Sequence, residues 1–528
     1  MNIRNNPLVY LFLKMWQYAE GNRPRVVLYI SLFVVANSLW ALEPLVIGKV
    51  LNTIQVQGIH EGNLWYLLGW LGLFMLLELL FWCFHGPARV VETLNAFIVG
   101  ANYKKYLLRG VTDFPMEWHV DHHSGDTIDK IDKGTRALTR FSEHTFEFLQ
   151  AIILLSASYI ALLFYDTRSA VLVIALTVFT FYLMMRFDRV LIPGYKIVNR
   201  IENKVSAKVF DSISNITTII VLRVKSLVLA SLSTQIQEPY GQYRKNTIVN
   251  EWKWFTAAVL GRFAVVAVLS WYIFYSVGIG ATVLAGTIYI LYGYVNQIRD
   301  TFFKFAYLYG DIVQQRTSVM NAEELAKDFL PDESLGERLP RSWSEIAVSN
   351  LTFSYHADEG ANLHLDNVSM KIRRGERIAL IGDSGGGKTT FLKLLRDLYH
   401  PRSLSLTVDG RPVPGGFAAI SESIALVPQD PEIFATTIRE NITLGVDYKE
   451  QHLRVFTDMA RFTDVVARLP HGLESSIVEK GVNLSGGEKQ RLALARGLLA
   501  CEGKDIVLLD EPTSSVDFDN ELAIYKNM

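Results

Sequence analysis

Cysteine is scarce in this chain of 528 residues, which contains only Cys83 and Cys501. Two cysteines exclude a disulfide framework and a cysteine metal cluster. The net charge is also close to zero, because 52 basic residues nearly balance 53 acidic ones. The composition therefore gives no electrostatic reason to expect a nucleic-acid partner. A cleavable signal peptide is not recognisable either, since basic residues interrupt the first apolar stretches and no small-residue cleavage site follows.

Apolar residues are abundant instead, at 50% of the chain, and they crowd its first part. About 20 apolar residues in a helix cross the hydrocarbon core of a bilayer. Six runs approach this length, at residues 26–50, 64–85, 146–165, 169–186, 255–277 and 283–309. The sequence therefore predicts an α-helical six-span transmembrane domain over residues 1–319, with the lipid bilayer as its partner.

The basic residues set the expected orientation of these spans. They concentrate in two long polar segments, residues 86–145 and 187–254, whereas Arg168 stands alone on the opposite side. By the positive-inside tendency, both segments and both termini face the cytoplasm. Residues 7–20 are apolar and aromatic but too short to span, which indicates an interfacial elbow helix.

The composition changes after residue 319. Residues 320–344 are charged and contain two prolines, as a solvated linker does. From 345 to 528, short β-rich runs alternate with amphipathic stretches, which is typical of an α/β domain with a parallel sheet.

A glycine-rich turn in this second domain matches G-x-x-x-x-G-K-[ST]. It lies between a predicted strand, Arg377–Ile381, and a predicted helix that begins near Lys388. Such a loop curls its backbone N–H groups around the phosphates of ATP, and the helix directs its positive end at the same anion. Lys388 is expected to reach the β- and γ-phosphates, and the Thr389 hydroxyl to hold Mg²⁺. The predicted nucleotide-binding residues here are Gly382, Asp383, Ser384, Gly385, Gly386, Gly387, Lys388, Thr389 and Thr390.

An acidic pair follows a second apolar run. Residues Ile506–Leu509 indicate a buried parallel strand, and Asp510 and Glu511 come directly after it. Asp510 is a candidate for the Mg²⁺ shell, and Glu511 is a candidate for polarising the attacking water.

The stretch LSGGE, from Leu484 to Glu488, supplies a third element. Ser485 and Glu488 have the spacing of a helix capping box, and capping alone is one explanation of the stretch. Capping does not account for Gly486 and Gly487, because glycine is a poor helix former. Exposed backbone at a positive helix end is a second phosphate-binding surface, which suggests a nucleotide site closed between two chains.

Taken together, these three motifs resemble those of an ABC-transporter ATPase, and the order of the two domains resembles an exporter-type half-transporter. The resemblance implies ATP and Mg²⁺ as ligands, a homodimer or heterodimer, and efflux of a small-molecule, lipid or peptide cargo across a bacterial-type inner membrane. It implies that Tyr355 stacks on adenine, that Gln429 contacts Mg²⁺ and assists catalysis by Glu511, and that LSGGE acts on the partner's nucleotide. Ser514, Ser515 and Asp517 match the D-loop, and Glu479 lies where the family contacts the membrane domain.

The family also places a switch histidine beyond the D-loop, and no histidine follows His471 here. We therefore expect a C-terminally incomplete copy of an ordinary transporter, truncated after the D-loop, with a natural weak ATPase as the alternative. A nucleotide-gated sensor or channel with little turnover is the second functional hypothesis.

Two charged residues within the predicted spans are candidates for a cargo path. Glu78 and Arg262 are costly at the centre of a bilayer, at about 2.5–3.5 kcal/mol each by insertion scales. Either side chain could line the path, although Arg262 is near enough to the cytoplasmic end of its span to snorkel.

Overall fold

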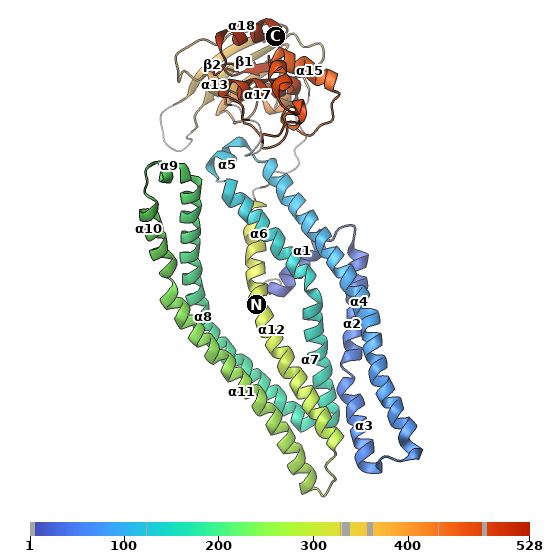
Figure 1. The fold of residues 1–528 in the computed structure, drawn as a ribbon. Coiled ribbons are helices and arrows are strands. Elements are labelled where there is room, and N and C mark those ends of the chain that lie inside the picture. The colour runs from blue at the N-terminus through green and yellow to red at the C-terminus, as the bar shows by residue number, and fades with distance from the viewer. Residues whose placement is uncertain are drawn as a thin grey trace. The chain divides into compact units, whose positions relative to one another are not determined.

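The computed structural model describes residues 6–122, 124–327, 329, 338–355, 363–430, 432–477 and 483–528. The chain divides into two compact units (Figure 1). The first comprises Met1–Arg109 and Ile128–Lys327, and the second comprises Gly110–Thr127 and Asp328–Met528. Residues 110–127 therefore group with the second unit, although they lie inside the predicted transmembrane domain.

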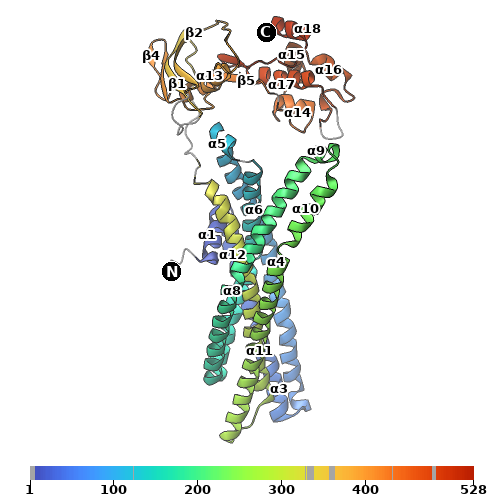
Figure 2. The same cartoon turned by 90° about the vertical axis from the view of Figure 1, so that its left-hand side faces the viewer.

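The first unit is built from helices. They are α1 (Pro7–Tyr18), α2 (Arg23–Trp40), α3 (Glu43–Gln57), α4 (Glu61–Thr112), α6 (Ser124–Glu143), α7 (Thr145–Tyr165), α8 (Thr167–Ser214), α9 (Ile216–Val221), α10 (Lys225–Gln237), α11 (Tyr240–Gly278) and α12 (Ala285–Leu325). The ends of α4 and α6 fall in the second unit, together with α5 (Met116–Asp121). Helices α8 and α11 run side by side in both views (Figures 1 and 2).

Five helical stretches in the described part of the chain are long and apolar enough to cross a membrane. They contain the first five predicted spans. Helix α4 has 52 residues and would extend about 78 Å at 1.5 Å per residue, well beyond a bilayer core of about 30 Å. The polar segments that follow the predicted second and fourth spans thus begin as continuations of α4 and α8.

The first predicted span, residues 26–50, is not a single helix. Helix α2 ends at Trp40, and α3 begins at Glu43 with Pro44 in its first turn. Proline has no backbone N–H and disfavours the helical conformation of the residue before it, so it suits a helix start better than a helix interior. The predicted span at residues 26–50 lies within one apolar helical stretch, Arg23–Gln57, which has a break before this proline.

Helix α12 contains the sixth predicted span from Ala285 onward and is not among the five apolar stretches. Its polar side chains instead find partners within the bundle. The Tyr294 hydroxyl donates to the carbonyl of Ala41 at 3.0 Å, and the Ser158 hydroxyl donates to Gln297 at 3.0 Å. Apolar residues of α7, α8, α11 and α12 form a buried core around it. A helix enclosed by other helices does not need the all-round apolar surface that faces lipid.

The elbow helix α1 also packs against α12. The Lys14 ammonium group lies 2.5 Å from a Glu323 carboxylate oxygen, and the Tyr18 hydroxyl donates to the other oxygen of Glu323 at 3.2 Å. Residues 7–18 are helical, as expected, and their last turn is anchored to the C-terminal part of α12.

Helices α3 and α12 meet through two glycines. A Cβ atom on Gly286 of α12 would overlap the carbonyl oxygen of Gly48 on α3. A Cβ atom on Gly48 would in turn overlap the side chain of Ile290. Small residues allow helix backbones in membranes to approach this closely, so the backbones of α3 and α12 are in direct contact.

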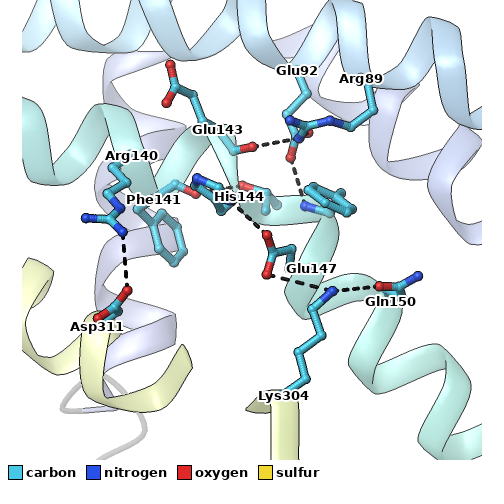
Figure 3. Close-up of polar contacts among 12 residues, drawn as sticks. Arg89, Glu92, Arg140, Phe141, Glu143, His144, Glu147, Gln150, Lys304 and Asp311 are labelled. Carbon is cyan, nitrogen blue, oxygen red and sulfur yellow. Dashed lines mark hydrogen bonds and ion pairs between the residues drawn. The ribbon is translucent and has the colours of Figure 1, made fainter. Parts of the chain in front are cut away.

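A break between α6 and α7 is capped by an ion pair from α4 (Figure 3). Arg89 donates to the carbonyl of Glu143, at the C-terminal end of α6, at 2.7 Å. The Glu92 carboxylate accepts the N–H of Phe146, in the first turn of α7, at 2.8 Å. Arg89 and Glu92 also bond each other, and Glu92 is fully buried. A cation at a helix C-terminus and an anion at an N-terminus satisfy orphan backbone groups and complement the helix dipoles.

Helix α12 contacts the same break from the other side (Figure 3). Lys304 donates to Gln150 at 2.9 Å and lies 3.8 Å from Glu147, while Asp311 pairs with Arg140 at 3.5 Å. These pairs hold the end of α6 and the start of α7 against one helix. The bend between α6 and α7 is therefore fixed by side chains of both α4 and α12.

We predict that Glu92→Ala clearly lowers the midpoint of thermal unfolding of the purified protein relative to the unchanged protein. Truncating one partner of a buried ion pair costs about 3–5 kcal/mol, because the other charge and the Phe146 N–H lose their partner. The matched control is Asp129→Ala, which breaks a half-exposed pair with Lys133 that is worth about 0.3–0.5 kcal/mol. Equal midpoints for the two variants would contradict this account of the break.

The second unit contains an antiparallel sheet and a parallel pair of strands. The antiparallel sheet has the order β2-β1-β3-β4. Its strands are β1 (Glu345–Phe353), β2 (Leu365–Arg373), β3 (Ser403–Val408) and β4 (Arg411–Pro412). Strand β5 (Ile424–Val427) pairs in parallel with β6 (Ile506–Leu509), from Ile424 opposite Ile506 to Val427 opposite Leu509.

Helices surround this parallel pair and form a second lobe (Figure 2). They are α14 (Ile438–Thr443), α15 (Glu450–Met459), α16 (Thr463–Arg468), α17 (Gly486–Ala500) and α18 (Phe518–Asn527), whereas α13 (Lys388–Leu395) lies beside the antiparallel sheet. One core packs α13 against the antiparallel sheet, and another packs α14, α15 and α17 together with Val427 and Ile524.

The strand predicted at Arg377–Ile381 does not belong to either sheet. Residues 376–383 have no regular secondary structure, and Ile381 is 93% exposed. An extended segment becomes a strand only when a neighbour supplies hydrogen-bond partners, whereas β5 and β6 pair with each other. The apolar composition of residues 377–381 indicated an extended backbone, but it did not show whether a neighbouring strand pairs with it.

Candidate functional site

The glycine-rich loop enters α13 with a left-handed backbone. Gly385 and Gly387 have φ values of 82° and 84°, which side-chain-bearing residues rarely adopt. A Cβ atom on Gly387 would lie 2.8 Å from the Leu365 side chain and 3.2 Å from the His364 carbonyl. The carbonyl of Asp383 accepts the N–H of Gly386 at 3.1 Å and closes the turn. Gly382 and Ser384 are exposed in the same loop.

Lys388 folds back over its own loop. Its ammonium group donates to the carbonyls of Gly382 and Asp383, both at 2.8 Å. This conformation places the positive charge at the loop whose N–H groups are expected to receive phosphate oxygens. Because α13 begins at Lys388, the positive end of the helix dipole lies at the same loop.

The two predicted metal ligands Thr389 and Asp510 are brought together. The Thr389 hydroxyl donates to an Asp510 carboxylate oxygen at 2.9 Å, across 121 positions of sequence. Asp510 is 7% exposed, and its N–H donates to Val427 of β5 at 3.0 Å. Hydroxyl and carboxylate oxygens are the hard donors that Mg²⁺ prefers, so these side chains fit the ion.

Gln429 and Glu511 also meet. The Gln429 side-chain amide donates to a Glu511 carboxylate oxygen at 3.0 Å. Both residues are exposed, and each follows the C-terminal end of a strand of the parallel pair. Glu511 has a φ of 43°, in the left-handed region that a non-glycine residue enters at a cost of about 1–3 kcal/mol. Such strain points to a functional position.

Tyr355 lies beside the start of α13. Its hydroxyl donates to the Thr390 hydroxyl at 3.2 Å, and its ring makes edge contacts with Phe353, His364 and Tyr399. The ring is 37% exposed. The structure thus places Tyr355, the predicted adenine-stacking residue, next to the phosphate loop and α13, where it is hydrogen-bonded to Thr390.

The LSGGE stretch forms the predicted capping box. The Ser485 hydroxyl accepts the N–H of Glu488 at 3.3 Å, and Glu488 accepts the N–H of Ser485 at 2.9 Å. This backbone bond, with help from Arg468 at 2.6 Å, holds the pKa of Glu488 below its usual value. Leu484 is buried, whereas Ser485 and Gly486 are exposed, and a Cβ atom on Gly486 would meet nothing within 4 Å. The turn is therefore open to an incoming group.

The predicted D-loop lies against this turn. A Cβ atom on Gly487 would lie 2.8 Å from the carbonyl oxygen of Ser515. Ser514 bonds the side chain of Gln490, and Asp517 caps α18 through the N–H of Asn520 at 3.1 Å. The bonds from Asn520 lower the pKa of Asp517.

The sequence analysis did not identify Gln490 as a functional residue. It is 3% exposed and shares a buried side of α17 with Leu494 and Leu498, four and eight residues later. A polar residue at the end of an apolar i, i+4, i+8 series is expected to be buried and therefore to need hydrogen-bond partners. That spacing was the available signal.

The two candidate cargo residues do not line the cavity within the first unit. Glu78 is exposed and accepts the indole N–H of Trp82 at 2.9 Å, and Arg262 is exposed on α11. A cavity of about 30 Å³ lies instead between α8, α11 and α12, and Arg299 contributes its charged lining group. The sequence analysis did not single out Arg299, whose guanidinium pairs with the neighbouring Asp300 at 2.8 Å. Glu479, which the resemblance assigned to a contact with the membrane domain, lies outside the described residues.

Two family models match the chain. A model of the ABC transporter transmembrane region matches residues 26–302, more than half of the chain, and a model of the ABC transporter matches residues 365–514. The protein therefore belongs to the ABC transporter family, with a helical transmembrane domain followed by an ABC ATPase domain.

Several curated relatives are similar to it. The ABC-type transmembrane transporter verA of Clonostachys rogersoniana is 24% identical over 100% of this chain and 43% of its own length. ATP-binding cassette sub-family B member 6 of Rattus norvegicus is 26% identical over 84% of this chain and 54% of its own. The mitochondrial iron-sulfur clusters transporter ATM1 of Saccharomyces cerevisiae is 36% identical over 35% of this chain and 26% of its own. The chain thus spans about half or less of the length of these relatives.

A solved structure has the same fold. The structure of a bacterial Atm1-family ABC exporter with ATP bound superposes with a TM-score of 0.79 at 22% identity. The match covers 96% of this chain and 88% of that one.

We predict that Gly387→Ala weakens nucleotide binding about tenfold or more. The new Cβ would require a left-handed backbone and would press on Leu365, at about 1–3 kcal/mol. Gly125→Ala is the matched control, because its Cβ would meet nothing within 4 Å, its φ is not positive and it lies outside the phosphate loop. Titration with a fluorescent ATP analogue measures both affinities. Equal losses in the two variants would contradict the geometry described for this loop.

Proposed function

We propose that this chain is a subunit of an ATP-driven exporter that couples hydrolysis at paired cassettes to efflux of an amphipathic or lipid-like cargo. The observation that carries the proposal is the convergence of two polar pairs, Thr389 with Asp510 and Gln429 with Glu511. These four residues come from three separate parts of the sequence and match the roles that the reaction needs.

The chemistry assigns a role to each group. The loop N–H groups and Lys388 hold the triphosphate. Thr389, Asp510 and Gln429 would hold Mg²⁺, which neutralises the charge that develops on the phosphate oxygens. The Glu511 carboxylate accepts a proton from a water molecule while the water oxygen attacks the γ-phosphorus. The bond from that phosphorus to the β-phosphate oxygen breaks, and ADP and phosphate leave.

Two chains are needed for this cycle. In the proposal, Ser485 and Gly487 of one chain close over the ATP that the other chain's loop holds, and Ser514, Ser515 and Asp517 lie at the seam. The open backbone at Gly486 and the exposed Ser485 support this arrangement. The dimer contains either two copies of this chain or one copy with a second half-transporter.

The cargo assignment is supported by the first unit. The cavity of about 30 Å³ is too small to hold a cargo molecule, but its lining combines apolar side chains with Thr177, Thr180 and Arg299, a mixture that suits an amphipathic molecule. In the proposal, opening of the helices enlarges this region, and Glu78 and Arg262 remain candidates for the wider path. The relatives include a mitochondrial protein and one from Haemophilus influenzae. A bacterial inner membrane therefore stays a prediction.

We predict that Glu511→Gln lowers kcat for ATP hydrolysis by about 10²–10⁴-fold, the usual contribution of a general base. Nucleotide affinity should change little, because the substitution keeps the shape of the side chain. The control Glu502→Gln neutralises a half-exposed carboxylate elsewhere in the same domain. Phosphate release and uptake of an amphipathic fluorescent probe are measured with the full-length protein in proteoliposomes. Nucleotide-dependent conductance without phosphate release would overturn the proposal in favour of a gated sensor or channel.

A further inference from the structure

The side chain of Gln490 links the LSGGE turn to the D-loop. It leaves α17 one turn after Ser485 and is 3% exposed. Its carbonyl oxygen accepts the N–H of Ser515 at 2.6 Å. Its amide donates to the Ser514 hydroxyl at 3.0 Å and to the carbonyl of Glu511 at 3.3 Å. One buried side chain therefore bonds both ends of the segment from residue 511 to residue 515.

The backbone of this segment folds around the same amide. The N–H of Ser514 donates to the carbonyl of Glu511 at 3.2 Å, and the N–H of Val516 donates to Thr513 at 2.9 Å. Glu511 has a φ of 43°, and such a conformation persists only where the surroundings impose it. The bond from Gln490 to the Glu511 carbonyl is one of the contacts that impose it.

The close approach at Gly487 is a second, independent link. The absence of a side chain there brings the first turn of α17 against the Ser515 carbonyl. A displacement of the LSGGE turn is thus passed to residues 511–515 through both backbone packing and hydrogen bonds, because close-packed elements transmit shifts instead of absorbing them.

We infer that Gln490 is a positioning residue that couples the two ATP sites of the dimer. This inference rests on the proposed function, in which the LSGGE turn serves the partner's ATP while Glu511 acts on the chain's own ATP. ATP captured by the turn fixes α17, and Gln490 then fixes the backbone of Glu511 at the other site. Occupancy of one site thereby sets the catalytic geometry of the second.

The coupling has a kinetic signature. In the intact protein, hydrolysis should depend on ATP concentration with a Hill coefficient above 1. Gln490→Met keeps the length of the side chain and removes all three bonds. It should lower kcat by about 10–100-fold, the effect of misplacing a catalytic group by an ångström. The Hill coefficient should fall to about 1, while the KM for ATP changes by less than about threefold because the phosphate loop is untouched.

The control is Leu494→Met, which alters the same buried side of α17 one turn further on and has no hydrogen bond to the D-loop. Thermal unfolding is measured for each variant. A purely structural role for Gln490 predicts that both variants lose stability and activity in proportion and keep the Hill coefficient of the unchanged protein. That result, or a Hill coefficient of 1 in the unchanged protein, would overturn the inference.

Ser514→Ala provides a second route if Gln490→Met does not fold. It removes the exposed partner of one Gln490 bond without altering the core. It should shift kcat and the Hill coefficient in the same direction by a smaller amount, and unchanged values would overturn the inference. Glu511→Gln, assayed in parallel, separates the two proposals. If Glu511→Gln leaves the rate of ATP hydrolysis unchanged, the proposed function fails. If Glu511→Gln abolishes hydrolysis but Gln490→Met keeps a Hill coefficient above 1, only the coupling fails.

Discussion

The parallel pairing of β5 with β6 is the interaction on which the candidate site depends. Its register places Val427 opposite Leu509, so that the chain leaves both strands at the same edge. Gln429 follows one strand by two residues, and Asp510 and Glu511 follow the other directly. A slip of one residue would turn every side chain to the opposite face of the sheet and separate Asp510 from Thr389.

The helical lobe adds a second constraint to this edge. Helix α17 carries the LSGGE turn at its first residues and packs its apolar side into the core that includes Val427. The segment after β6 is therefore enclosed between a strand end and a helix start. The strained backbone of Glu511 is understandable in that position, because neighbours on both sides determine its conformation.

The sequence predicted correctly the features that depend on residues close together in the chain. The glycine-rich loop, the capping box at Ser485 and the apolar strand at Ile506–Leu509 have short-range signals, and each is present. The meeting of Thr389 with Asp510 agrees with the two motifs, which each assigned one ligand to Mg²⁺, although neither motif gives the distance between them. Arg377–Ile381 was placed wrongly as a strand, since pairing depends on a partner that its own composition does not specify.

Tertiary contacts between distant helices gave no sequence signal. Arg89 and Glu92 appeared only as members of a charged segment, yet they cap the break between α6 and α7. Hydrophobic periodicity does not show which backbone groups a charged residue on another helix will reach. For Gln490 the apolar i, i+4, i+8 series was a signal of burial, but it did not identify residues 511–515 as the hydrogen-bond partners.

The glycine contact between α3 and α12 has a mechanical consequence for the bundle. At Gly48 and Gly286 the two backbones touch directly, and the side chains of Ile290 and Asn52 fill the space beside them instead of separating the helices. This contact is a fixed point close to the N-terminal end of α12. The two helices can then move relative to each other only by rotating about this point. The displacement is largest at the other end of α12, which contacts Lys14 of the elbow helix.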